Sequence, residues 1–125
     1  MPHTTTARIQ LNERGVLVVR INDGAQQSLA DAKENLSVAV SETGGKRLPL
    51  LIDIRRAQPL DADARHHYSG QTLVDAFSAL ALLVDARPFG RMMGNVYLRI
   101  AQPGIPARLF FEEEAAVDWL DGLQP

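Results

Sequence analysis

The sequence contains no cysteine and no long hydrophobic run, and both absences narrow its function. Without cysteine, none of the 125 residues can form a disulfide bond, a thiolate metal site or a thiol nucleophile. No apolar run reaches the roughly 18 residues of a membrane-spanning helix, and Met1–Gln10 lack the apolar segment of a secretion signal. We therefore expect a cytoplasmic protein with no membrane span.

An excess of positive charge is also missing. The formal net charge at pH 7 is −2, so the chain as a whole does not attract nucleic acid or anionic membranes. Lysine is scarce, since Lys33 and Lys46 are the only two and arginine supplies the rest of the 13 basic residues. A guanidinium binds a carboxylate or phosphate through two parallel hydrogen bonds, which an ammonium group cannot form. We expect no nucleic-acid partner.

No motif of a catalytic, metal or cofactor site is present. The chain has neither a glycine-rich phosphate loop nor a Gly-x-Ser-x-Gly nucleophile turn. Asp63, His66 and His67 form a titratable cluster, but neighbouring helical residues point about 100° apart and zinc requires three or four ligands. We expect no catalytic residue, no metal and no cofactor. An enzyme that uses the His66/His67 region or the Arg55/Arg91 edge is the alternative.

The first part of the chain predicts a hairpin followed by a helix. β-rich runs at residues 8–11 and 16–21 flank a short turn that contains glycine, which is typical of an antiparallel hairpin. Ser28 and Asp31 then have the spacing of a capping box, and an apolar stripe continues until Gly44-Gly45 ends the helix.

The middle of the chain predicts a central strand and a second helix. Leu48–Ile54 is nearly continuous in apolar residues, which suits a strand covered on both faces. Asp61 is a good N-cap for the helix that follows, and Ser69-Gly70 is a weak point within it.

Two later segments are ambiguous by pattern alone. Residues 79–84 could continue the helix or form a buried strand, and residues 95–100 have strand propensity but also helical spacing. Architecture favours one solution. If residues 79–84 form a strand, Pro88–Ala101 becomes the helix that returns the chain to a parallel strand at residues 107–110.

The chain closes with acids at 112–114, which favour a helix start, and with Gly122 as its end. The complete order is ββαβαβαβα. This is an α/β fold with a mixed sheet of about five strands, an N-terminal antiparallel hairpin and parallel crossovers. Residues 1–6 are expected to be frayed, and residues 7–125 to form a single domain. Four side chains are predicted to be almost fully buried: Ile52, Leu82, Leu109 and Trp119.

This element order resembles the STAS domain, the fold of bacterial anti-anti-sigma factors, over about residues 7–122. The likeness is greatest to stand-alone STAS-like proteins that are grouped with SEC14-type lipid-binding domains. In those proteins the last strand and helix read as Phe, several acids, Ala and Trp-Leu. The same pattern is present here as Phe110, Glu112–Glu114, Ala116 and Trp119-Leu120. These are core and cap residues, so the resemblance implies a fold rather than an activity.

The functional signature of true anti-anti-sigma factors is only partly present. The resemblance places Asp53 and Asp61 at the two acidic positions of that signature. It places Ala62, which has no hydroxyl, at the phosphoacceptor serine. The phosphorylation switch therefore cannot operate at this position. Asp63 could act as a fixed negative charge in place of the phosphate, although acids are common in the first turn of any helix.

The carboxyl ends of the predicted parallel strands form the remaining candidate site, since open α/β sheets tend to bind ligands there. Arginine guanidinium groups and exposed backbone N–H groups at helix starts could bind an anion at this edge. The alternative is that the arginines pair with Glu112–Glu114 in a surface network. The candidate binding residues are Arg55, Arg56, Asp61, Asp63, Arg87 and Arg91.

The sequence thus predicts a STAS-like binding or regulatory module without catalysis. Its partner would be a protein that contacts the face around Arg55–Asp63. The alternative is a small apolar or anionic ligand, which would make the protein a carrier or sensor. The N-terminal hairpin offers an exposed antiparallel edge, so we also expect a homodimer.

Overall fold

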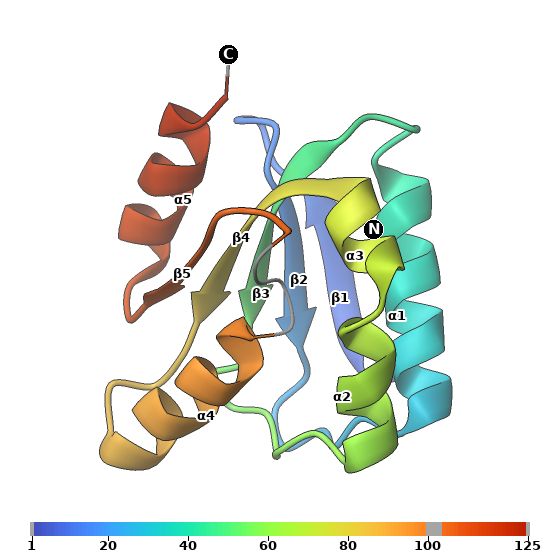
Figure 1. Ribbon diagram of the computed structural model, residues 1–125, viewed down its shortest axis with the longest axis vertical. Helices are drawn as coiled ribbons and strands as arrows, with labels where there is room; N and C mark the ends of the chain where they lie inside the picture. Colours follow the sequence, from blue (N-terminus) through green and yellow to red (C-terminus); the bar gives the residue numbers. More distant parts are fainter. Residues whose placement is uncertain (1, 100–103, 125) are drawn as a thin grey trace.

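A five-stranded mixed sheet forms the centre of the molecule (Figure 1), as the computed structural model shows for residues 2–99 and 104–124. The strands lie side by side in chain order; the first pair is antiparallel and every later pair is parallel. The elements are β1 (Ala7–Leu11), β2 (Leu17–Ile21), α1 (Leu29–Glu42), β3 (Leu48–Asp53), α2 (Ala62–Tyr68), α3 (Gln71–Ala76), β4 (Phe77–Leu83), α4 (Pro88–Leu98), β5 (Ala107–Phe110) and α5 (Glu113–Gly122).

The hairpin and the first helix form where the sequence predicted them. Gly15 in the turn between β1 and β2 has a φ of 78°, a conformation that glycine adopts without strain. Ser28 caps α1 as expected: its hydroxyl accepts the backbone N–H of Asp31, whose carboxylate accepts the N–H of Ser28.

The central strand β3 contains a proline, which is unusual between two neighbouring strands. Pro49 lies at the start of β3, where its register with β4 shifts, and pairing with β2 begins one residue later, at Leu50. A residue without an N–H is tolerated here because the regular ladder has not yet begun.

The ambiguous segments resolve as the architecture predicted. A break at Ser69-Gly70 separates α2 from α3, and β4 follows α3 directly. α4 begins at Pro88 and connects two parallel strands, so residues 95–98 are helical rather than extended. We expected this helix to reach Ala101, which lies outside the described residues.

Helices cover the two faces of the sheet unequally. On one face, α1, α2 and α3 pack together, with α1 over β1 and β2 and α3 against β4. On the same face, α4 packs over β4 and β5. In the described part of the chain, α5 is the helix that covers the other face (Figure 1), and it packs on alternate residues of β3 and β4 such as Leu51, Ala81 and Leu83. Strand residues alternate between these two cores because successive side chains point to opposite faces.

The N-terminal segment is packed rather than frayed, which corrects our expectation for residues 2–6. Thr4 and Thr6 are buried, and the Thr4 hydroxyl donates to the side-chain oxygen of Asn35 on α1. The outward-facing N–H of Ile9 donates to the carbonyl of Pro2 at 3.0 Å. The N-terminal segment therefore occupies part of the free edge of β1, where we expected a second copy of the chain to pair.

The predicted core is only partly correct. Leu82 is buried, whereas Ile52, Leu109 and Trp119 are half-buried. Leu109 and Trp119 lie near the edge of the sheet, where β5 has no further neighbour. Ile52 lies on the central strand β3 but faces an open pocket instead of a helix. Sequence patterns identify the apolar strands but do not show which of their side chains a helix covers.

The start of α4 lies unusually close to the loop before it. A Cβ atom on Gly90 would stand 2.3 Å from the carbonyl oxygen of Asp85. We expect Gly90→Ala to lower the free energy of unfolding by about 1–3 kcal/mol, because the backbone must move to admit the methyl group. Gly122→Ala is the matched control, since a Cβ at Gly122 has no contact within 4 Å.

Urea denaturation of both variants measures this effect. Gly122→Ala should leave stability unchanged or raise it by up to about 1 kcal/mol through helix propensity. A Gly90→Ala variant as stable as the wild type would show that α4 does not need this close approach.

Candidate functional site

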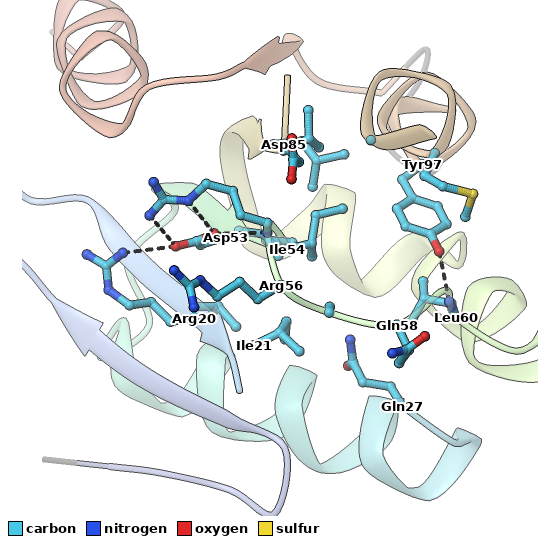
Figure 2. Close-up of a pocket in the computed structure, with 18 of the residues that line it drawn as sticks. Arg20, Ile21, Gln27, Asp53, Ile54, Arg56, Gln58, Leu60, Asp85 and Tyr97 are labelled. Carbon is cyan, nitrogen blue, oxygen red and sulfur yellow. Dashed lines mark hydrogen bonds and ion pairs between the residues drawn. The ribbon is translucent and has the colours of Figure 1, made fainter. Parts of the chain in front are cut away.

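A pocket of about 1420 Å³ opens at the carboxyl edge of the sheet, on the face that carries α1, α2 and α4. It lies between α4 on one side and α1 with α2 on the other, and the loop at 54–60 lies along it (Figure 2). Its floor consists of apolar side chains from β2, β3 and β4: Val19, Ile21, Leu50, Ile52, Leu80 and Leu82. The pocket is larger than the usual range of about 300–1,000 Å³ for small-molecule sites.

A buried polar cluster forms the wall on the α1 side. The Gln27 side-chain oxygen accepts hydrogen bonds from the Tyr68 hydroxyl and, at 2.8 Å, from the Asn35 amide. The Asn35 amide also donates to the Thr6 hydroxyl at 2.9 Å. Burial raises the pKa of Tyr68 to about 12, so this hydroxyl stays protonated at neutral pH. The cluster joins the N-terminal segment, α1 and α2 around one side of the pocket.

On the opposite wall, Tyr97 of α4 reaches the loop that follows β3. Its hydroxyl oxygen accepts the backbone N–H of Leu60 at 2.8 Å, and the residue is only 5% exposed. Burial raises the pKa of this hydroxyl as well. Figure 2 shows the ring of Tyr97 above Leu60, with Gln27 and Gln58 below. The hydrogen bond therefore ties α4 to the loop across the pocket.

Two arginines and two acids form an ion-pair cluster at the end of β3, on the α5 face. Arg20 of β2 forms a bidentate pair with Glu113 at 2.6 and 2.7 Å and also contacts Asp53 at 3.1 Å. Arg55 donates to both oxygens of Asp53, at 3.0 and 2.8 Å. The cluster, which we call the Asp53 cluster, joins β2, β3 and the start of α5.

The arginines of this cluster keep both acids ionised. Burial acts to raise the pKa of Asp53, but the hydrogen bonds and positive charges of Arg55, together with the charge of Arg20, outweigh it and lower the pKa. The hydrogen bonds from Arg20 lower the pKa of Glu113. Asp53 is therefore a fixed anion at neutral pH and a poor proton acceptor.

The four arginines that the sequence placed at this edge do not converge on one point. Arg55 belongs to the Asp53 cluster, and Arg56 contacts Asp23 at 3.6 Å, with both side chains exposed. Arg87 pairs with Asp85. Arg91 donates to the carbonyl of Ala86 at 2.8 Å, and its guanidinium lies 4.7 Å from the ring centre of Phe111.

The two candidate acids lie at the start of α2. Asp61 is the N-cap, and its carboxylate accepts the N–H of Ala64 at 2.8 Å. Asp63 is exposed in the first helical turn, and Ala62 begins the helix. Neither acid lines the pocket, and neither does the His66-His67 pair.

Sequence reasoning missed several residues of this site. Arg20 carried a usable signal, because it is a charged residue inside an apolar strand and such a residue needs a buried partner. Gln27 and Tyr97 carried none, since a glutamine before a helix and a tyrosine on an apolar helix face are common in any fold. Only the packing of distant segments places them on one pocket.

Comparisons with known proteins identify a family and a fold. A family model described as "Domain of unknown function (DUF7793)" matches residues 9–124. One similar solved structure is that of an uncharacterized protein of the DUF3478 family with a SpoIIAA-like fold, from Shewanella loihica PV-4. Its sequence is 17% identical to this chain, and the two structures superpose with a TM-score of 0.64. The match covers 96% of this chain and 98% of the other chain. The chain therefore has a SpoIIAA-like fold, which confirms the resemblance to STAS domains at the level of architecture.

The other comparisons add no function. A protein of unknown function from Arthrobacter sp. FB24 is 26% identical over 94% of this chain and 100% of its own, with a TM-score of 0.36. No curated protein matches this chain. Within residues 2–99 and 104–124, no helix is long and apolar enough to span a membrane. The same residues contain no group of three or more side chains placed to hold a metal ion.

The lowered pKa of Asp53 predicts how its contribution to stability depends on pH. A carboxyl whose pKa is lower in the folded state stabilises the fold above its ordinary pKa of about 4, and this contribution disappears as the pH falls through the folded value. We expect Asp53→Asn to cost about 1.5–3 kcal/mol at pH 7, because Arg20 and Arg55 lose their shared anion. The loss of unfolding free energy caused by Asp53→Asn should be smaller at pH 3 and below.

Urea denaturation at both pH values measures this difference. Asp118→Asn is the control, because Asp118 pairs with Arg14 on the surface and its side chain is 60% exposed. That variant should stay within about 0.5 kcal/mol of the wild type at pH 7. An equal cost for Asp53→Asn at both pH values would contradict an ionic role for Asp53.

Proposed function

We propose that this chain, which belongs to the family described as a domain of unknown function (DUF7793), acts as a non-catalytic binding module. Its pocket receives a small molecule with an apolar body. The observation that carries this proposal is the large pocket over β3, where Ile52 and Ile54 are only half-buried. Parallel sheets normally have both faces covered by helices. Here the central strand β3 leaves Ile52 half-buried at a pocket of about 1420 Å³.

The physical reason for a ligand is the cost of the uncovered surface. Apolar area removed from water contributes about 25 cal/mol per Å². A molecule that covers the half-buried side chains Ile52, Ile54 and Met93 gains this contribution without any rearrangement of the sheet. A pocket with an apolar floor and a few polar side chains on its walls is also the usual form of a small-molecule site.

The side chains of the pocket support binding rather than catalysis. Among the described residues, no serine, threonine, histidine or lysine lines it, so it offers no activated hydroxyl, imidazole base or amine nucleophile. Its buried acid, Asp53, is held ionised by two arginines. These features favour the carrier or sensor function over the enzyme alternative.

A phosphorylation-controlled regulator is a weaker proposal. In the anti-anti-sigma factors that the fold resembles, the switch requires a serine at the position of Ala62. Ala62 begins α2 directly after the N-cap Asp61, and it has no hydroxyl to modify. A regulatory function of this chain would therefore have to depend on its ligand rather than on phosphate at this position.

Titration with N-phenyl-1-naphthylamine, a neutral dye that fluoresces in apolar surroundings, tests the proposed function. We expect the wild-type protein to bind the dye and Ile52→Trp to weaken its affinity about tenfold or more, because the indole fills the floor of the pocket. Leu11→Trp is the matched control: Leu11 is 42% exposed on β1 and does not line the pocket. Its dye affinity should equal that of the wild type.

The thermal midpoint of each variant shows whether the fold survives the substitution. A wild-type protein that does not bind the dye would contradict the proposed function. Equal affinities of Ile52→Trp and the wild type would show that the dye binds elsewhere.

A further inference from the structure

We infer that the ligand of this pocket carries an anionic head group with acceptor oxygens, such as a carboxylate or a phosphate ester, in addition to its apolar body. This inference rests on the proposed function and specifies the ligand class. It follows from the hydrogen-bonding groups that the pocket walls leave unused, and from the charge at the pocket rim.

The first unused group is the side-chain amide nitrogen of Gln27. The orientation of this amide is set by its neighbours, because its oxygen accepts from both Tyr68 and Asn35. Its nitrogen makes no hydrogen bond to any other described residue, although Gln27 is only 4% exposed. Figure 2 shows the amide turned toward the interior of the pocket. Two N–H donors therefore face the space that a ligand would occupy.

The second unused group is the hydroxyl proton of Tyr97. The oxygen of this hydroxyl already accepts the N–H of Leu60, and the structure shows no acceptor for its proton among the described residues. Burial raises the pKa of Tyr97, so the proton is retained at neutral pH. Gln27 and Tyr97 thus each offer an unused donor, which a ligand satisfies with acceptor atoms.

The charge at the pocket supports an anion. Five arginines but only three aspartates line it, with no glutamate or lysine, whereas the chain as a whole has a net charge of −2. Arg20, Arg55 and Arg87 have close carboxylate partners. The Arg56 side chain is 78% exposed, and the one ion pair it makes with the described residues, to Asp23, is long at 3.6 Å. Its guanidinium therefore has donors available for a ligand oxygen.

The arrangement also separates the two parts of the ligand. The backbone N–H of Gly24 donates to the carbonyl of Arg56 at 2.8 Å, and that of Gln58 donates to the carbonyl of Ala25 at 2.9 Å. These bonds hold the loop that carries Arg56 beside the segment that leads to Gln27. The proposed head group lies near this loop, while the apolar body extends over Ile52.

Four probes with the same ten-carbon chain test this inference: decanoate, decyl phosphate, decanol and decyltrimethylammonium. We measure how well each probe displaces N-phenyl-1-naphthylamine at concentrations below the critical micelle concentration of that probe. We expect the two anions to bind at least about tenfold more tightly than the quaternary ammonium probe, which offers no acceptor and carries the opposite charge. Comparison of decanoate with decyl phosphate shows which anionic group the pocket prefers.

Two variants locate the head group. Gln27→Glu keeps the oxygen that accepts from Tyr68 and Asn35 but replaces the two donors with a negative oxygen. We expect it to weaken decanoate binding about tenfold or more without weakening decanol binding by as much. Gln26→Glu, which introduces the same charge at the exposed neighbouring residue outside the pocket, should have little effect.

Arg56→Gln provides an independent measurement, because Arg56 is exposed and its loss should not disturb folding. It should weaken decanoate binding about tenfold. Arg47→Gln, at the opposite end of the sheet, should leave this affinity unchanged.

The outcomes separate the inference from the proposed function. Equal binding of the anionic and cationic probes, or unchanged decanoate affinity in both Gln27→Glu and Arg56→Gln, would overturn the anionic head group while dye binding still supported the pocket. Failure of the dye and of all four probes to bind would overturn both.

Discussion

The parallel pairing of β2, β3, β4 and β5 is the constraint on which the rest of the structure depends. Each parallel connection must return the chain to the starting edge, so helices lie on the faces and the carboxyl ends of four strands meet at one edge. The helices between β3 and β4 are short, because a break at Ser69-Gly70 separates α2 from α3. These short helices leave part of the sheet face uncovered, and the pocket lies there.

Electrostatics at the carboxyl edge complete this arrangement. The Asp53 cluster lies on the α5 face, where it connects two strands and a helix and neutralises most of the nearby charge. Near this cluster, the exposed Arg56 makes only a long ion pair with Asp23 among the described residues. The same edge thus combines a paired, structural cluster with the arginine that the proposed ligand would contact.

The fold could be predicted largely from local sequence signals. The capping box at Ser28, the apolar run of β3 and Pro88 at the first turn of α4 each specify an element through nearby residues. The ambiguity at residues 79–98 was resolved by topology, since a parallel neighbour requires a returning helix. The N-terminal segment was wrongly expected to be frayed, because the partner of Thr4, Asn35, lies 31 residues away.

By itself, the sequence determined the types and order of the secondary-structure elements and the position of the arginine-rich edge. Periodicity, caps and turns act over a few residues, and the carboxyl ends of parallel strands must share an edge. Only the tertiary structure decided which strand residues the helices leave uncovered, which acid each arginine pairs with, and that Gln27 and Tyr97 face the same pocket. These features depend on positions to within a few ångströms between segments that are far apart in the chain, and hydrogen bonds and ion pairs weaken steeply beyond such distances.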